Sequence, residues 1–190
     1  MSPSHRRTSL RRLNRYLRHS ERILASWDAF TEFNTDLDGW PFDQDAYGRR
    51  AAVRDADTAT AFASIRPGAR QLLATARLQL QQLPAHLTRD SWPGQLRVLE
   101  EALCRLDALD KQWQQTRAQL PQGAGPGTEA YIDALDEHHA ECWSYLDDWA
   151  NHGRAILDIQ AATRRAATQP KRPQLPAVKL RHGGYRATRR

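Results

Sequence analysis

The chain has 190 residues and a net charge of +6, from 28 Lys and Arg residues against 22 Asp and Glu residues. This length allows one domain with a hydrophobic core and appended segments. No apolar run reaches the roughly 18 residues of a membrane-spanning helix, and two cysteines, Cys104 and Cys142, are too few for a disulfide framework. We therefore expect a cytoplasmic protein that does not bind membranes.

The charge is concentrated at the two ends of the chain. Residues 1–22 and 164–190 hold 16 of the 28 basic residues and one of the 22 acidic residues, so these ends carry +15 and the 141 residues between them carry −9. Clustered arginines release condensed counterions from phosphate backbones, so this plan favours a nucleic-acid partner. The alternatives are that the ends are solvated, or that they pack on acidic surfaces of other proteins or of other copies.

The first predicted element is a helix over about residues 8–33, where apolar residues recur at three- and four-residue steps. Its first half carries arginines around a thin leucine stripe, and its second half is aromatic and acidic. This change of character predicts that the helix projects from the body or lies across its end.

A loop is expected in residues 34–45, because Gly39 and Pro41 interrupt the helical pattern. Trp40 and Phe42 within it are expected to pin the loop to the core. A second helix then follows, over about residues 44–64, and its small residues permit the close approach of a neighbouring helix.

Three further helices are predicted. The third begins at Pro67 and ends at Pro84, and the fourth begins near Ser91 and keeps a seven-residue apolar repeat to about Leu120. The fifth covers about residues 128–165 and is the longest, so it is expected to form the spine. The pattern therefore predicts an all-α fold, an antiparallel bundle of four to five helices with a basic N-terminal helix and an extended basic C-terminal arm.

His138 and Cys142 stand four residues apart in the fifth predicted helix and so share one face, where His139 or Cys104 would be needed to complete a zinc site. No recognised zinc spacing is present. Cysteine is among the most often buried residue types without any metal, and a histidine in an apolar seam can satisfy itself by hydrogen bonds. We predict ordinary packing at both residues, with no metal and no other cofactor.

Carboxylates on the same helix do not indicate a catalytic centre. A ferritin-like site requires Glu-x-x-His on two helices and two further Glu residues, and Asp136 with His139 is the only local approximation. No nucleophile with a matching base is defensible either. We therefore predict that the protein is not an enzyme.

The C-terminal arm contains no acidic residue, and Pro170, Pro173 and Pro176 recur at every third position, which favours an extended path. Beyond them, Tyr185 lies among basic residues. This mixture suits single-stranded nucleic acid, because a ring can stack on a base while arginines follow the phosphates. The chain is thus expected to comprise a basic N-terminal part of the first helix (1–22), a helical bundle (23–165) and a basic Pro-containing arm (166–190).

Two resemblances point in the same direction. The first is carried by a pattern of seven residues over 131–157: Tyr131, Leu135, Glu137, His138, Leu146, Arg154 and Leu157. This pattern resembles the conserved helical segment of the primosomal replication protein C family, which implies single-stranded DNA binding during replication restart. In overall plan the chain is also similar to the small subunit of CRISPR effector complexes, whose basic surface follows guide RNA or displaced DNA. Neither resemblance assigns the chain to a family.

The sequence therefore predicts a non-catalytic, nucleic-acid-binding helical subunit of a larger nucleoprotein complex, with single-stranded RNA or DNA and other protein subunits as partners. Sequence-specific reading of duplex DNA is not expected, because no helix-turn-helix or zinc-finger signature is present. The alternative is a structural or adaptor protein whose basic arms clamp acidic protein surfaces or mediate self-assembly. The predicted nucleic-acid-binding residues are Arg6, Arg7, Arg11, Arg12, Arg15, Arg18, Arg164, Arg165, Lys171, Arg172, Lys179, Arg181, Tyr185, Arg186, Arg189 and Arg190.

Overall fold

The computed structural model describes residues 3–168, with side chains described from Arg6 onward. The all-α class predicted from the sequence is confirmed over this part of the chain. The predicted C-terminal arm lies almost entirely outside it. The described elements are α1 (Pro3–Asn34), α2 (Gln44–Ala63), α3 (Arg66–Gln82), a short 3-10 turn η1 (Ala85–Leu87), α4 (Ser91–Gln119), α5 (Glu129–His152) and α6 (Arg154–Thr168).

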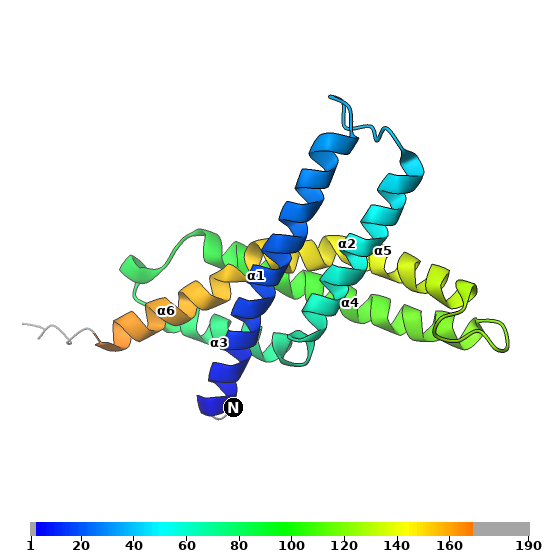
Figure 1. The fold of residues 1–190 in the computed structure, drawn as a ribbon. Coiled ribbons are helices and arrows are strands. Elements are labelled where there is room, and N and C mark those ends of the chain that lie inside the picture. The colour runs from blue at the N-terminus through cyan, green and yellow to red at the C-terminus, as the bar shows by residue number, and fades with distance from the viewer. Residues whose placement is uncertain (1–2, 169–190) are drawn as a thin grey trace, which may run out of the picture.

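The helices form two sets that cross each other (Figure 1). α1 and α2 make an antiparallel hairpin, and this hairpin lies across a layer formed by α3, α4, α5 and α6. Within the layer α4 packs along α5, and α3 packs against α6. α5 also packs against α2, so α5 joins the hairpin to the layer.

The core lies where the hairpin crosses the layer. Phe62 of α2 stands edge-on to Tyr16 of α1, with ring centroids 5.5 Å apart, and to Trp149 of α5, with centroids 5.3 Å apart. The Tyr16 hydroxyl donates a hydrogen bond to the Leu146 carbonyl oxygen at 3.0 Å. Other buried core residues are Leu13, Leu17, Ile65, Leu72, Leu73, Leu96, Leu99, Leu103, Ile156 and Ile159.

Each helix of residues 3–168 is too short or too polar to cross a bilayer.

α1 is anchored by its basic half. Leu13, Tyr16 and Leu17 are fully buried, because they share one face of the helix and the arginines occupy the others. The second half of α1 and the first half of α2 extend beyond the layer (Figure 1). The projecting part of the helix is therefore the aromatic and acidic half, and α1 crosses the body instead of capping its end.

The prediction that Trp40 and Phe42 pin the α1–α2 loop to the core is wrong. Their side chains are 70% and 72% exposed. The loop is closed by its own backbone instead: the Asp36 N–H donates to the Trp40 carbonyl oxygen at 2.9 Å, and the Phe42 N–H donates to the Asn34 carbonyl oxygen at 2.9 Å. Gly39 adopts a φ of +84°, which favours glycine at the turn.

The predicted fifth helix over residues 128–165 is divided into α5 and α6 at Gly153, so the longest helix is α1, with 32 residues. The Gly153 N–H still donates to the Trp149 carbonyl oxygen at 3.0 Å. A Cβ atom at position 153 would lie 2.6 Å from that oxygen and 3.0 Å from Cδ2 of Leu17. A side chain at this position would therefore clash with the backbone of α5 and press on Leu17 of α1.

Candidate nucleic-acid interface

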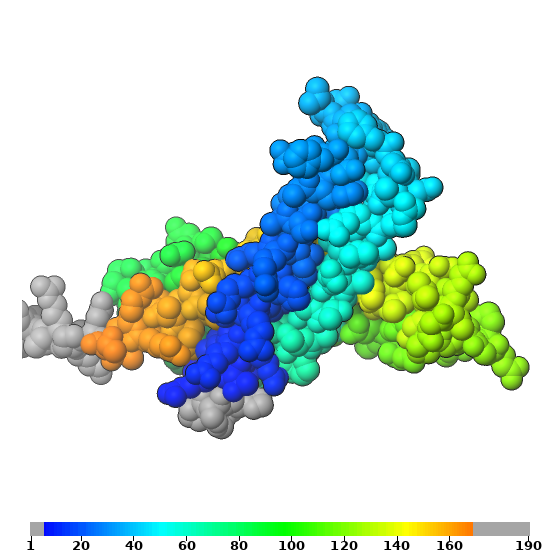
Figure 2. Space-filling view, in the orientation of Figure 1, coloured from blue at the N-terminus to red at the C-terminus, as the bar shows by residue number. Residues whose placement is uncertain are grey.

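A basic groove lies between the N-terminal half of α1 and α6. Its volume is about 570 Å³. Figure 2 shows α6 beside this half of α1. The lining residues are Arg7, Leu10, Arg11, Asn14, Leu157 and Arg164. We call these six residues the basic groove.

Helix geometry places the groove residues together. Arg7, Arg11 and Asn14 follow one another at four and three residues along α1, so they share one face. Leu157 and Arg164 stand seven residues apart, two turns of α6, and therefore also lie on one face. The result is three arginines around a small apolar surface supplied by Leu10 and Leu157.

The groove arginines keep their charge uncompensated. No ion pair joins Arg7, Arg11 or Arg164 to any residue between 6 and 168. None of the described residues that line the groove is acidic. An anion can therefore bind these guanidinium groups without first breaking an ion pair between the arginines and a carboxylate of the protein.

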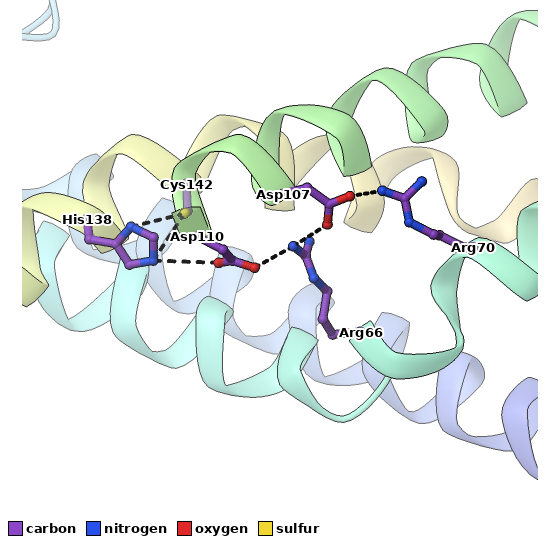
Figure 3. Close-up of polar contacts among 6 residues, drawn as sticks. All are labelled: Arg66, Arg70, Asp107, Asp110, His138 and Cys142. Carbon is purple, nitrogen blue, oxygen red and sulfur yellow. Dashed lines mark hydrogen bonds and ion pairs between the residues drawn. The ribbon is translucent and has the colours of Figure 1, made fainter. Parts of the chain in front are cut away.

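Several arginines of the body, in contrast, are held in ion pairs. Arg66 lies 2.7 Å from an Asp107 oxygen and 2.5 Å from an Asp110 oxygen, and Arg70 pairs with the other Asp107 oxygen (Figure 3). Arg77 pairs with Glu100 at 2.5 Å. These pairs join α3 to α4, so the basic residues that the body uses for packing are distinct from those of the groove.

Arg6 has a structural position beside the groove. Its guanidinium donates a hydrogen bond to Oε1 of Gln160 in α6. The same oxygen accepts a hydrogen bond from the Gln79 side chain of α3 at 3.3 Å. Arg6 thereby joins the start of α1 to Gln160 of α6, which is itself bonded to α3.

The remaining predicted arginines of α1, Arg12, Arg15 and Arg18, are exposed further along the helix. Arg165 is exposed beside Arg164 near the end of α6. The structure therefore brings basic residues of the two chain ends to one region, an arrangement that the sequence did not predict. Eight predicted residues lie outside the described part of the chain: Lys171, Arg172, Lys179, Arg181, Tyr185, Arg186, Arg189 and Arg190.

Asn14, Leu10 and Leu157 belong to the groove but were not predicted from the sequence. Asn14 stands seven residues after Arg7 and three after Arg11, which is a signal that a helical projection would have found. Leu10 and Leu157 resemble any other core leucine in sequence. Only the packing of α1 against α6 shows that they face an open groove.

His138 and Cys142 lie in a separate small depression, of about 160 Å³, between α2, α3, α4 and α5. The Cys142 sulfur is 3.8 to 3.9 Å from the two His138 ring nitrogens, and Nε2 of His138 is 3.9 Å from an Asp110 oxygen (Figure 3). The His138 ring is stacked on Trp113. Cys104 is exposed and lines another surface with Arg70, away from this depression.

Burial determines the protonation states of Cys142 and His138. It raises the pKa of the Cys142 thiol to about 12, with the Asp110 and Glu141 carboxylates adding to the shift. Burial also lowers the pKa of His138 below its ordinary 6.5. At neutral pH the side chains are a thiol and a neutral imidazole, a state suited to packing. Among residues 6–168, no three His, Cys, Asp or Glu side chains are placed to hold a metal ion.

Comparison with known proteins finds no relative that would assign a ligand to the groove. No protein-family model matches the chain. No curated protein and no solved structure matches it either. A function for the basic groove must therefore be argued from its own chemistry.

Proposed function

We propose that the protein is a non-catalytic nucleic-acid-binding subunit that holds the phosphate backbone of single-stranded RNA or DNA in the basic groove. The observation that carries this proposal is the convergence of Arg7, Arg11 and Arg164 from distant parts of the sequence, with no carboxylate partner among residues 6–168. Clustered arginines of this kind bind phosphates by releasing counterions. The apolar groove floor offers a surface for nucleotide bases beside the phosphates.

The exposed arginines of α1 extend the proposed binding path. Arg7 and Arg18 are separated by eleven residues, which span about 16 Å along a helix. A stacked single strand advances about 3.4 Å per nucleotide, so this distance matches about five phosphates. Arg11, Arg12 and Arg15 lie between the two ends of this path.

A binding role also agrees with the other polar cluster. Nucleophilic catalysis by a cysteine requires a thiolate, and burial disfavours the thiolate of Cys142. A binding subunit needs further proteins for chemistry, which supports the proposal that this chain works within a larger nucleoprotein complex.

The test is binding of a fluorescently labelled single-stranded oligonucleotide, measured by anisotropy at several salt concentrations. The variant Arg7→Gln/Arg11→Gln/Arg164→Gln should bind at least about tenfold more weakly at low salt, with a slope of log affinity against log salt smaller by about 2. Each substitution removes one phosphate contact without adding a negative charge.

The matched control is Arg49→Gln/Arg97→Gln/Arg105→Gln. These arginines are exposed and form no ion pair within residues 6–168, so the control loses the same net charge from other surfaces. The control should retain most of the affinity. Equal losses in the two variants would mean that net charge alone acts, and would reject the groove as the binding site.

A further inference from the structure

The end of the α1–α2 hairpin exposes an apolar surface. Phe33 is 77% exposed, Leu37 is fully exposed, and Trp40 and Phe42 are exposed as described above. Figure 2 shows this end of the hairpin standing clear of the other helices. We call residues 28–45 the acidic tip, because they include six Asp and Glu residues. Large apolar side chains gathered on a protruding surface are typical of a protein-binding site.

The backbone of the acidic tip is stabilised by hydrogen bonds within the loop. One carboxylate oxygen of Asp36 accepts hydrogen bonds from the N–H groups of Asp38, at 3.0 Å, and Trp40, at 2.8 Å. Asp43 caps α2 by accepting from the Ala46 N–H at 2.9 Å. Thr35 and Pro41 form an isolated bridge across the loop. Trp40 and Phe42 are therefore presented outward by an ordered loop, which lowers the entropy cost of binding a partner.

The apolar side chains are surrounded by negative charge. Residues 28–45 contain six acidic residues and no Lys or Arg. None of the six forms an ion pair with any residue of the described chain. The six are Asp28, Glu32, Asp36, Asp38, Asp43 and Asp45.

This charge selects the partner. Nucleic acid and anionic lipid surfaces are repelled by six negative charges, so neither suits the acidic tip. A complementary partner is a basic polypeptide that also carries apolar side chains. Residues 169–190 of this chain have that composition: they contain seven Lys or Arg residues, no acidic residue, and Leu175, Val178, Leu180 and Tyr185.

We propose that the acidic tip of one copy binds residues 169–190 of a second copy, so that the protein self-associates head to tail. Trp40, Phe42 and Leu37 supply the apolar contact, and the carboxylates pair with the arginines and lysines of the arm. This interaction uses a surface other than the basic groove, so it stands independently of the function proposed above.

The experiment is complementation between two full-length variants, followed by sedimentation velocity at micromolar concentrations. The tip variant is Leu37→Ser/Trp40→Ser/Phe42→Ser. In the arm variant, Gln replaces Lys171, Arg172, Lys179, Arg181, Arg186, Arg189 and Arg190. Wild type should form dimers or larger species, and each variant alone should associate at least about tenfold more weakly.

A mixture of the two variants should form a heterodimer, because the intact tip of one can still bind the intact arm of the other. Mixing tests the pairing directly, since no loss of folding can produce a gain of association. The matched control for the tip is Leu78→Ser/Ile132→Ser, which removes exposed apolar side chains elsewhere and should associate as wild type does. A monomeric wild type, or a mixture that stays monomeric, would overturn the proposal.

Discussion

At the scale of single residues, Arg54 of α2 is the connection between the hairpin and the layer. Its guanidinium carbon lies 4.2 Å from the Trp27 ring centroid in α1 and 3.9 Å from the Trp143 ring centroid in α5. The same guanidinium pairs with Asp55 at 2.7 Å; the Asp55 side chain is buried, and that of Arg54 is partly buried. One charged group therefore joins three helices by stacking and neutralises a buried carboxylate.

We predict that Arg54→Gln lowers the free energy of unfolding by about 3 kcal/mol at pH 7, because it leaves Asp55 buried without its counter-charge. Burial already raises the pKa of Asp55, and the Arg54 hydrogen bond and charge oppose that shift. A raised carboxyl pKa means that the folded state binds the proton more tightly, so stability falls as pH rises through that pKa. Urea unfolding monitored by circular dichroism should show a defect that grows from about pH 4 to pH 7.

The control for this prediction is Arg54→Gln/Asp55→Asn, which has no carboxylate to desolvate. Its defect should be smaller at neutral pH and nearly independent of pH. A pH-independent defect in Arg54→Gln itself would mean that the lost stacking on Trp27 and Trp143, and not the buried charge, accounts for the stability change.

Residue environments were the least predictable feature of the sequence. Trp40 and Phe42 are large aromatic residues of the kind that usually lies in a core. The loop, however, forms hydrogen bonds between its own backbone groups, and both rings remain exposed. Asp55 is polar by composition but buried, because Arg54 from the same helix compensates it. Both outcomes depend on the partners of a side chain in three dimensions, which an amino-acid type does not specify.

At the scale of helices, position 153 shows how a break can be invisible in sequence. The seven-residue apolar repeat continues from α5 into α6, and Gly153 keeps a helical φ of −60°. The predicted bounds of α2, α3 and α4 agree with the structure to within about two residues, whereas α1 begins five residues before its predicted start. At the division between α5 and α6, a Cβ atom on Gly153 would meet the Trp149 carbonyl oxygen and the side chains of Leu17 and Leu13.

We predict that Gly153→Ala destabilises the protein by about 1 to 3 kcal/mol, because the added methyl group clashes with the Trp149 carbonyl oxygen and the Leu17 side chain. Thermal unfolding followed by circular dichroism provides the measurement. Gly48→Ala is the matched control: it lies inside α2 with nothing within 4 Å of a Cβ, so the change should stabilise by about 0.5 to 1 kcal/mol. Stabilisation by alanine at both positions would show that the junction tolerates a side chain.

At the scale of the whole molecule, α1 carries both proposed surfaces. Its N-terminal half holds Arg7 and Arg11 in the basic groove, and its C-terminal end holds Asp28 and Glu32 of the acidic tip. Its 32 residues extend over about 48 Å. The basic first half and the acidic second half of this helix could be predicted from composition. The contact between α1 and α6 could not, because it depends on tertiary packing between helices that are far apart in the sequence.

The sequence predicts that basic residues of the C-terminal arm bind nucleic acid, and we propose that residues 169–190 bind the acidic tip of another copy, so the two partners share one arm. We predict that a single-stranded oligonucleotide dissociates the self-associated protein, because phosphates compete with the tip carboxylates for the same lysines and arginines. Sedimentation velocity with increasing oligonucleotide should show the larger species converting to monomers bound to nucleic acid. The basic-groove variant, Arg7→Gln/Arg11→Gln/Arg164→Gln, should self-associate as wild type does and need more oligonucleotide for dissociation. If the oligonucleotide instead bound without releasing monomers, the arm would not be shared, and the two surfaces would act at the same time.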